Sequence, residues 1–485
     1  MLRRRSPLVC VFLAAVSSFA VSANLDELKH DSDALAGSIY TGPSMSTLRE
    51  LTDTVGGRLT GSPAYNRAAD WAAAKFRIYG LENVHLEPFS MPNGWQRGSA
   101  SGQILSPTSR PLHIESLGWS PSTPPGGIKG EVFVVTDIHT DKLKEQASQM
   151  KGKVVFIDTS KAFAGGFAKV FAFIKPAWQV WKDAGVLGVL YPDRESNNVL
   201  NAHDLGWGGD LSLLPGAEIG MEDSKLIRRL LERGPVSVSF TLDNKTSGTM
   251  HVNNVIAEIR GAETPNEWLL VGAHLDSWDF GTGAQDNGTG TASVLEVARA
   301  IAAMGKKPRR TIRFALWGGE EQGLLGSYAY AKAHAEDLKN CIAVLNTDNG
   351  SGHPKGWKVE GRKDLEAALQ PISDNLLKDI SGGAISQETT FDTDHGPFML
   401  YGVPALDLWV DMKPYMEIHH KSSDTVDKVD PLDFKAGTAI LAITTYAIAQ
   451  MPQAIAQHID HAAVGEILKK AELDELLQAV GVWQP

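Results

Sequence analysis

Five groups of side chains that could bind metal lie on five separate segments of this chain. They are His274, Asp286, the pair Glu320-Glu321, Asp348 and the pair His419-His420. Imidazole and carboxylate donors without a thiolate suit zinc, with cobalt or manganese possible. Each group follows or lies near a short apolar run typical of a strand, so solvated surface explains the set poorly. The combination predicts a site for two metal ions and therefore a hydrolase.

The spacing also suggests how the ligands would be divided between two ions. Two divalent ions about 3.5 Å apart need a bridging carboxylate and roughly two further ligands each. Asp286 follows the glycine-rich segment 281–285 at the start of a predicted helix, where it could be the bridge. His274 and Asp348 would complete one ion. Glu321 would bind the other ion together with one of the two adjacent histidines, His419 or His420.

Two carboxylates beside these ligands have other expected roles. Asp276 lies two residues after His274, on the same side of an extended chain, and would hold the imidazole in the tautomer that binds metal. Glu320 follows a strand and a tight turn, so its side chain can diverge from that of Glu321 and face water. There it could accept a proton from water whose pKa the ions lower, and pass it to a leaving amine. The expected reaction is amide hydrolysis, with zinc stabilising the oxyanion.

The other histidines and the cysteine give weaker patterns. His395 precedes the apolar run 398–403 and is a candidate for the substrate pocket. Cys341 begins an apolar run, which favours a small buried hydrophobe over a nucleophile. The remaining histidines carry no constellation and are expected to be surface or satisfied core groups: His30, His85, His113, His139, His203, His251, His334, His353, His458 and His461.

The segments that must position these groups alternate from residue 253 onward. Strands are predicted over 268–273, 311–317 and 341–347, and helices over 292–304, 324–335 and 365–380. This rhythm predicts a parallel or mixed sheet with helices on both faces. In such sheets ligands collect at the carboxyl ends of strands. His274, Glu320, Glu321 and Asp348 all follow a predicted strand end.

The first half of the chain has a different texture. Ser62-Pro63 opens a helical pattern that reaches Tyr79. Residues 105–247 contain short β-type runs at 130–136, 153–157 and 186–191, separated by proline-rich turns. We therefore expect one catalytic domain formed by residues 24–104 and 248–485, with a β-rich domain inserted at 105–247.

Composition and the N-terminus bear on partners and location. The chain has 485 residues, 43% hydrophobic and 21% charged, and a net charge of −11, which argues against nucleic acid or an anionic membrane as a partner. Basic residues 3–5, the apolar run 8–16 and small residues up to Ala23 predict a signal peptide over 1–23. The mature protein would be periplasmic or secreted, without a membrane anchor.

Four motifs give the chain a resemblance to a known family. They are GRLTGSPA at 57–64, HLDSWD at 274–279, FALWGGEEQG at 314–323 and HHKSSDT at 419–425. With them the chain resembles the M28 family of zinc exopeptidases over nearly the whole mature sequence. In that family the last motif reads His, three residues, Asp-Thr, and its histidine is a ligand. The resemblance therefore selects His420 and leaves His419 as a candidate for contacting substrate.

The resemblance also implies a fold and an activity. The fold would be a three-layer α/β/α catalytic domain of the phosphorylase/hydrolase-like type with a mixed sheet, and a protease-associated domain as the insert. Two zinc ions per chain would be bridged by Asp286, with Glu320 as general base. Members act on short peptides as dipeptidases or aminopeptidases, and one branch is associated with dipeptides and with homodimers.

Two other classes of function share this fold. Glutaminyl cyclases have the catalytic domain but lack the inserted domain, which argues against a cyclase. Non-catalytic receptors have lost metal ligands, whereas all five ligands and Glu320 are present here. Whether the protein is an amino-, carboxy- or dipeptidase depends on pocket residues that no motif identifies.

Overall fold

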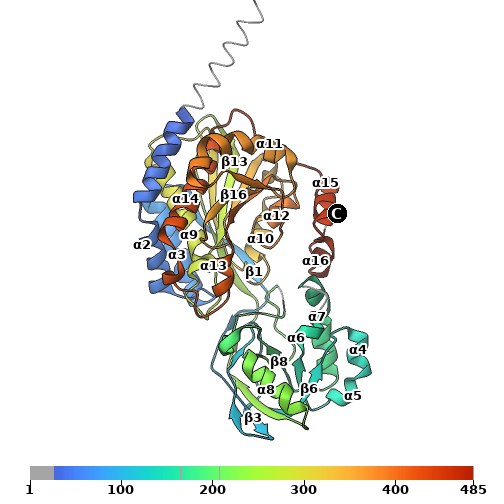
Figure 1. Ribbon diagram of the computed structural model, residues 1–485. Helices are drawn as coiled ribbons and strands as arrows, with labels where there is room; N and C mark the ends of the chain where they lie inside the picture. Colours follow the sequence, from blue (N-terminus) through green and yellow to red (C-terminus); the bar gives the residue numbers. More distant parts are fainter. Residues whose placement is uncertain (1–26, 164–166, 207, 484–485) are drawn as a thin grey trace, which may run out of the picture.

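The computed structural model describes residues 27–163, 167–206 and 208–483. The predicted signal peptide, with its cleavage site after Ala23, lies outside the described residues. The chain forms two units, each built on an eight-stranded sheet, with the smaller one below the larger in Figure 1. A helix over residues 27–41 and α2 (Ser44–Arg49) begin the described chain.

The larger unit contains a mixed sheet. In spatial order its strands are β1 (Glu82–Met91), β12 (Met250–Ile259), β14 (Arg310–Trp317), β13 (Thr264–His274), β15 (Cys341–Asn346), β18 (Ala405–Val410), β16 (Pro354–Lys358) and β17 (Ala384–Ser386). The four central strands β14, β13, β15 and β18 are parallel neighbours. Their carboxyl ends therefore lie at one edge of the sheet, as the strand pattern predicts.

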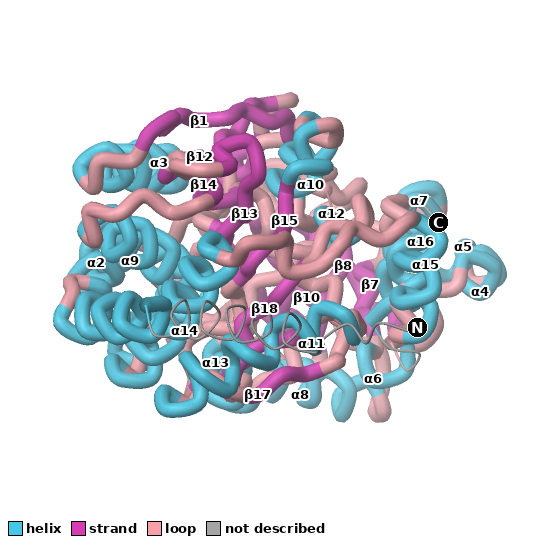
Figure 2. Tube along the Cα trace, turned by 90° about the horizontal axis from the view of Figure 1, so that it is seen from above, coloured by secondary structure: helices cyan, strands magenta, loops and turns pink. Residues whose placement is uncertain are grey.

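Alternate side chains of β13 contact helices on opposite faces of this sheet. Leu269 and Val271 pack in one core cluster with residues of α3 (Pro63–Ile78), α9 (Thr289–Ala303) and α14 (Pro431–Gln450). Trp268 and Leu270 pack in another cluster with residues of α10 (Leu325–Ala333) and α12 (Gly396–Met399). A strand buried on both faces in this way is typical of a parallel sheet covered by helices. Figure 2 shows α9 and α14 on one side of the strands and α10 and α12 on the other, which confirms the three-layer prediction.

The predicted helices are present, with one difference. The Ser62 hydroxyl accepts a hydrogen bond from the backbone N–H of Tyr65 and caps α3, as expected for Ser-Pro at a helix start. The helix predicted over 365–380 is instead α11 (Lys363–Ile372), followed by the π-helical segment η5 (Ser373–Leu377) and the 3-10 turn η6 (Lys378–Ile380). Pro371 lacks the N–H that would continue the hydrogen-bond ladder, so the regular helix ends beside it.

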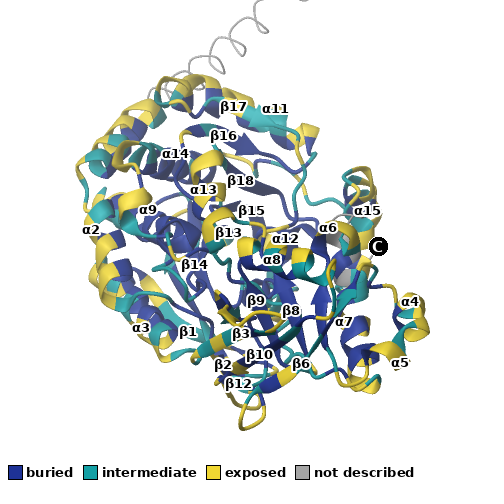
Figure 3. Cartoon of the chain, turned by 60° about the horizontal axis from the view of Figure 1, so that its bottom comes forward, coloured by how far each residue is buried: buried dark blue, intermediate teal, exposed yellow. Residues whose placement is uncertain are grey.

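The smaller unit also has a mixed sheet. Its order is β4 (Arg110–Pro111), β3 (Ala100–Ser106), β10 (Ser237–Leu242), β6 (Ile128–Val135), β7 (Val154–Ile157), β8 (Gly188–Pro192), β9 (Gly216–Ile219) and β5 (Ile114–Ser116). The strands β7 and β8 pack on one face against Trp178 and Trp181 of α7 (Phe167–Asp183), and on the other against Ile227 of α8 (Met221–Leu231). Figure 3 shows β8 and its neighbour β9 in the colour of buried residues. The unit is thus more helical than the sequence suggested, with α4 (Thr140–Glu145), α5 (Ala147–Met150) and α6 (Thr159–Ala162) in addition.

The two connections between the units pair with each other. The strand β2 (Trp95–Gln96) bonds antiparallel to β11 (Lys245–Thr246) in a separate two-stranded sheet. A domain boundary at 104/105 would cut β3, which lies wholly in the smaller sheet. We therefore propose that the inserted unit begins directly after β2 and ends before β11, and its kinship with protease-associated domains stays a prediction.

The insert also contacts the larger unit at a point important for the site. The N–H of Ala202 donates to the carbonyl of His420 (2.8 Å), and Lys421 forms an ion pair with Glu195 (3.1 Å). Near the connections, Arg97 pairs with Asp279 (2.9 Å). At the C-terminus, α15 (His461–Lys470) leads to α16 (Asp474–Ala479), which packs on α7 of the insert (Figure 1).

Among the described residues, only α14 is long and apolar enough to cross a membrane. Of its most apolar stretch, 78% is buried inside the protein, where the helix packs against α9. It is therefore a core helix of the larger unit.

Candidate active site

The predicted ligands converge at the carboxyl edge of the larger sheet. His274 ends β13, and Asp348 follows β15, the next parallel strand. The Nε2 atom of His274 lies 2.8 Å from Oδ1 of Asp348 and 3.2 Å from Oδ1 of Asp286. All three side chains are buried. These atoms form one face of the site. They belong to the three residues that the sequence predicts as ligands of the first ion.

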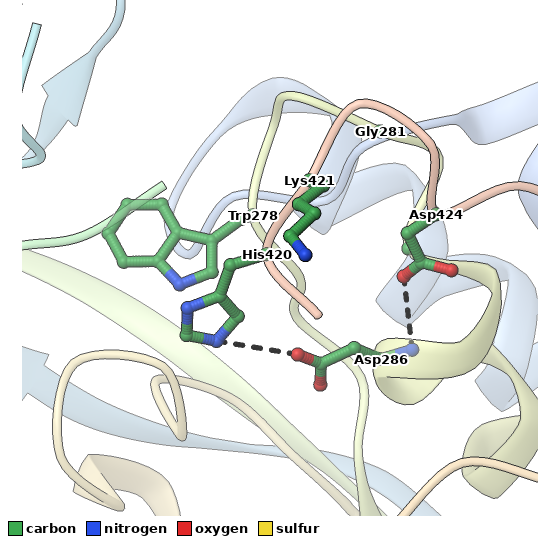
Figure 4. Close-up of a pocket in the computed structure, with 7 residues that line it drawn as sticks. Trp278, Gly281, Asp286, His420, Lys421 and Asp424 are labelled. Carbon is green, nitrogen blue, oxygen red and sulfur yellow. Dashed lines mark hydrogen bonds and ion pairs between the residues drawn. The ribbon is translucent and has the colours of Figure 1, made fainter. Parts of the chain in front are cut away.

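The second face lies on the other side of Asp286. The Nε2 atom of His420 lies 3.4 Å from Oδ2 of Asp286 and 3.1 Å from Oε2 of Glu321. The two carboxylate oxygens of Asp286 thus face two different ligand sets. Figure 4 shows this carboxylate pointing at the imidazole of His420, while the carboxylate of Asp424 accepts the backbone N–H of Asp286 (3.1 Å). Asp286 is therefore placed as a bridge would be.

His419 and His420 differ in position although their rings stack with centroids 3.6 Å apart. His420 faces both Asp286 and Glu321, whereas His419 approaches only Asp286, at 3.7 Å. His420 also has a φ of +61°, a left-handed conformation uncommon outside glycine and often found at functional sites. The geometry supports His420 as the ligand and leaves His419 at the rim, with 31% of its side chain exposed.

The charge balance of the cluster fits divalent cations. Burial raises the pKa of Glu321 well above its ordinary value, and it raises that of Asp348 to about 7, with the charge of Asp286 adding to both shifts. Burial would raise the pKa of Asp286 too, but the hydrogen bond with His274, together with the charges that the three nearby histidines carry in acid, outweighs it and lowers the pKa of this carboxyl group. Its Oδ2 atom is buried without a hydrogen-bond partner among the described residues. Cations between these carboxylates would compensate their crowding and satisfy that oxygen.

The imidazoles fit as well. Burial lowers the pKa of His420 to about 4 and that of His419 to about 3, so both rings are neutral at pH 7 and have a free lone pair. Metal-capable atoms gather in three overlapping groups that share His274 or Asp286: His274 with Asp286 and Glu321, His274 with Glu320 and Asp348, and Asp286 with His419 and His420. The donor set of nitrogen and oxygen without sulfur is typical of catalytic zinc.

Glu320 lies beside the ligands with its side chain 13% exposed. Gly319 turns the chain with a φ of +73°, so that Glu320 and Glu321 leave the turn in different directions. An oxygen of Glu320 lies 4.0 Å from Nε2 of His274. Burial, with the nearby carboxylate of Asp348, raises the pKa of Glu320 well above its usual value. A carboxyl group in this environment can both accept and return a proton.

Asp276 fixes the tautomer of His274 in a way the sequence did not show. Nδ1 of His274 donates to the backbone carbonyl of Asp276 (3.0 Å), since a carbonyl can only accept, and Nε2 faces the carboxylates of Asp348 and Asp286. The Asp276 carboxylate lies 3.7 Å from the ring. It accepts instead the backbone N–H groups of Glu320 and Glu321, both at 3.3 Å. Asp276 therefore positions two segments of the site at once.

The segment 57–64 is the support for this arrangement. The Thr60 hydroxyl donates to the Asp276 carboxylate (2.7 Å). Arg58 is fully buried and donates to the carbonyls of Leu275 (2.7 Å), Thr282 (2.8 Å) and Gly283 (2.9 Å). It thereby fixes both ends of the loop that joins His274 to Asp286.

We expect Thr60→Val to lower kcat by about 10-fold with little change in KM, because a hydrogen bond to a charged group contributes about 1.5–3 kcal/mol. The loss should come with weaker zinc binding in a chelator competition. Thr60→Ser retains the hydroxyl and should restore both properties. Equal zinc affinity and kcat in Thr60→Val and the unsubstituted protein would rule out this role.

His395 is not at the rim where a substrate-binding residue would be expected. It has no exposed surface, its Nδ1 is 2.6 Å from the Thr393 hydroxyl, and its Nε2 is 3.6 Å from Oε1 of Glu360. Burial alone would lower its pKa, but Glu360 and then Asp407 raise it to about 9. His395 is thus half of a buried ion pair in the core behind the site.

Three further residues near the site were not predicted as site residues, and of these only Asp424 lies in a motif, HHKSSDT at 419–425. Asp394 is buried, accepts from the Ser327 hydroxyl (2.5 Å), and lies close enough to Glu320 to influence its pKa. Asp424 accepts the N–H of Gln285 (2.7 Å) and so fixes the turn η3 (Ala284–Gly288) that carries Asp286. His203 of the insert lies against His420. Their partners are distant in sequence, so spacing gave no indication of them.

Comparison with known proteins places the chain in a family. The model of "Peptidase family M28" matches residues 254–444, a range that contains every proposed ligand. Carboxypeptidase Q of Mus musculus is 31% identical, over 85% of this chain and 87% of the relative. The chain belongs to peptidase family M28.

Solved structures agree with this family assignment. A peptidase M28 precursor from Shewanella amazonensis SB2B is 28% identical, with a TM-score of 0.76 over 90% of this M28 chain and 100% of that chain. BSAP, a zinc aminopeptidase from Bacillus subtilis, is 21% identical, with a TM-score of 0.66 over 86% of this chain and 97% of that one. The second similarity is one of fold. The predicted α/β class and peptidase family are thereby confirmed.

Proposed function

We propose that this protein is a di-zinc exopeptidase that hydrolyses dipeptides or other short peptides. The observation that carries the proposal is the division of the Asp286 carboxylate, with one oxygen toward His274 and Asp348 and the other toward His420 and Glu321. The names of the relatives, a carboxypeptidase and a zinc aminopeptidase, support peptide hydrolysis and zinc.

The proposed roles follow from the positions of the side chains. His274, Asp286 and Asp348 would hold one ion, and Asp286, Glu321 and His420 the other. When bound, the ions would polarise the carbonyl of the substrate and lower the pKa of the attacking water toward neutral pH. Glu320, partly exposed beside His274, would take the proton of the attacking water and return it to the departing nitrogen. Asp276 would hold Nδ1 of His274 through its backbone carbonyl, so that Nε2 faces the metal.

We also propose a location and an oligomeric state for the whole protein. Export to the periplasm or outside the cell, without a membrane anchor, depends on the predicted signal peptide at 1–23. A homodimer is expected from the resemblance to one branch of the family. A short peptide as substrate, with no nucleic acid partner, agrees with the family and with the net charge of −11.

Metal removal tests the proposal directly. Dialysis against a chelator should abolish cleavage of a panel of free, N-blocked and C-blocked dipeptides, and two equivalents of zinc per chain should restore it. Chelation should also lower the unfolding temperature, because zinc at about 100 times its Kd contributes about 2.7 kcal/mol per site. Cleavage that persists after complete metal removal would refute the proposal.

A further inference from the structure

One imidazole of the insert lies next to the ligand histidines. His203 directly follows Ala202, whose N–H donates to the carbonyl of His420 (2.8 Å). The ring centroids of His203 and His420 lie 6.0 Å apart. A molecule that binds beside His420 therefore meets a side chain contributed by the other unit.

The His203 ring is held in one orientation. Its Nδ1 lies 3.0 Å from the carbonyl oxygen of Asn201 and 3.1 Å from Oε1 of Glu218 on β9. Because a carbonyl can only accept, Nδ1 carries hydrogen and the ring cannot turn without losing these contacts. Glu218 has no exposed surface, so its carboxylate is buried behind the ring. This pairing leaves the other ring nitrogen, Nε2, on the side of the ring that faces away from the buried carboxylate.

The outer edge of His203 is accessible. Its side chain is 33% exposed, close to the 31% of His419, while the ligand carboxylates of Asp286 and Asp348 are 6% and 5% exposed. Nε2 of His203 makes no hydrogen bond to any other residue in the described part of the chain. His203, His419 and His420 thus form the accessible wall on this side of the site.

Neighbouring cationic side chains are already paired. Lys421 is bound by Glu195 (3.1 Å) and by the carbonyl of Glu417 (3.0 Å), and Arg97 is bound by Asp279 (2.9 Å). His203 therefore presents a partly exposed ring nitrogen beside His420 that a negatively charged part of a substrate could reach. The indole of Trp278 is as near to His420, with ring centroids 5.8 Å apart, but its N–H is buried.

Distance selects the group that would bind there. In a dipeptide the free carboxylate lies one residue beyond the scissile bond, at most about 3.6 Å further along the chain. A hydrogen bond adds about 2.9 Å. Together these lengths are of the same order as the 6.0 Å between the ring centroids of His203 and the proposed zinc ligand His420. A longer leaving peptide would place its carboxylate beyond this reach.

We propose that His203, oriented by Glu218, binds the free α-carboxylate of the residue released by cleavage. The substrates would then be dipeptides and peptides that lose one residue from the carboxyl end. This inference rests on the proposed function and assigns the insert a direct part in substrate selection.

The test compares His203→Gln with the unsubstituted zinc-loaded protein on three substrates: a free dipeptide, the same dipeptide as its C-terminal amide, and the dipeptide extended by one residue at its carboxyl end. The unsubstituted protein should cleave the free dipeptide with kcat/KM about 10-fold or more above the amide, since hydrogen bonds to charged groups are the strong ones. His203→Gln should lose about 10- to 100-fold on the free dipeptide, mainly through KM, and change less than about 2-fold on the amide.

Two variants make the result specific. Glu218→Gln should also lower kcat/KM for the free dipeptide, because it removes the carboxyl group that orients His203. His113→Gln is the matched control: His113 is also a histidine of the insert paired with a carboxylate, Asp223 (2.9 Å), but its side chain is 64% exposed. It should behave like the unsubstituted protein on all three substrates.

The possible failures are distinguishable. If the unsubstituted protein cleaves the free dipeptide and the amide equally well, or if His203→Gln lowers both alike, the inference about His203 is wrong and the exopeptidase proposal stands. If the zinc-loaded protein cleaves none of the three peptides, the proposed function itself fails, and the inference with it.

Discussion

Replacing Glu320 with Gln is expected to lower kcat by about 10²- to 10⁴-fold, the usual contribution of a general acid–base group. The amide has nearly the shape of the carboxylate but cannot accept a proton from water at neutral pH. Because the proposed ligands are other residues, zinc content should stay at two per chain. Zinc analysis and steady-state kinetics on the same preparation measure both quantities.

A nearby exposed glutamate supplies the control. Glu417 on α13 (Lys413–Ile418) is exposed and lies close in sequence to His419 and His420. Glu417→Gln makes the same chemical change and should alter kcat by less than about 2-fold, as surface substitutions normally do. If Glu320→Gln retained the native rate, Glu320 would not be the base.

The second large effect is expected for Asp286→Ala. This substitution removes one ligand from each proposed ion, so it should abolish activity and reduce zinc to less than one equivalent per chain. It should also lower the unfolding temperature in the presence of zinc to that of the chelated protein, because the stabilisation from binding disappears with the site. Metal analysis and calorimetry test the two parts.

Asp70, exposed on α3, is the matching control. Asp70→Ala should keep both zinc ions, the activity and the zinc-dependent stability. Two tightly bound zinc ions in Asp286→Ala would contradict a bridging role. One retained ion would mean that one ligand set is sufficient without the shared carboxylate.

Much of the larger unit could be predicted because the local sequence pattern of each strand agrees with the strand that forms. The apolar runs at 268–273, 311–317 and 341–347 became β13, β14 and β15, and the residues that follow them meet at one edge. Parallel strands impose this convergence whatever the loop details. The sequence alone therefore predicts that His274, Glu320, Glu321 and Asp348 lie close together.

What the sequence did not predict depends on contacts between distant segments. Thr60 meets Asp276 across 216 positions, and Arg58 meets Gly283 across 225. No periodicity encodes such pairs. For the same reason His203 resembled an ordinary surface histidine, although folding brings it to His420. The opposite holds for His395, which the sequence suggests for the substrate pocket. Folding buries this side chain beside Glu360 instead.

The insert was also harder to predict than the larger unit. Its strands β6, β7 and β8 are apolar runs that the sequence pattern predicts. The boundary predicted at 105, in contrast, lies inside β3. The two strands next to the connections, β2 and β11, have only two residues each. Elements this short carry no alternation pattern, so only the paired structure defines where one unit ends.

The measurement that tests the account most directly is an anomalous difference map at the zinc absorption edge, from a crystal of the zinc-loaded protein. We predict two peaks, one between Asp286, His274 and Asp348 and the other between Asp286, Glu321 and His420, separated by about 3.5 Å. A single peak, or peaks away from Asp286, would contradict the account.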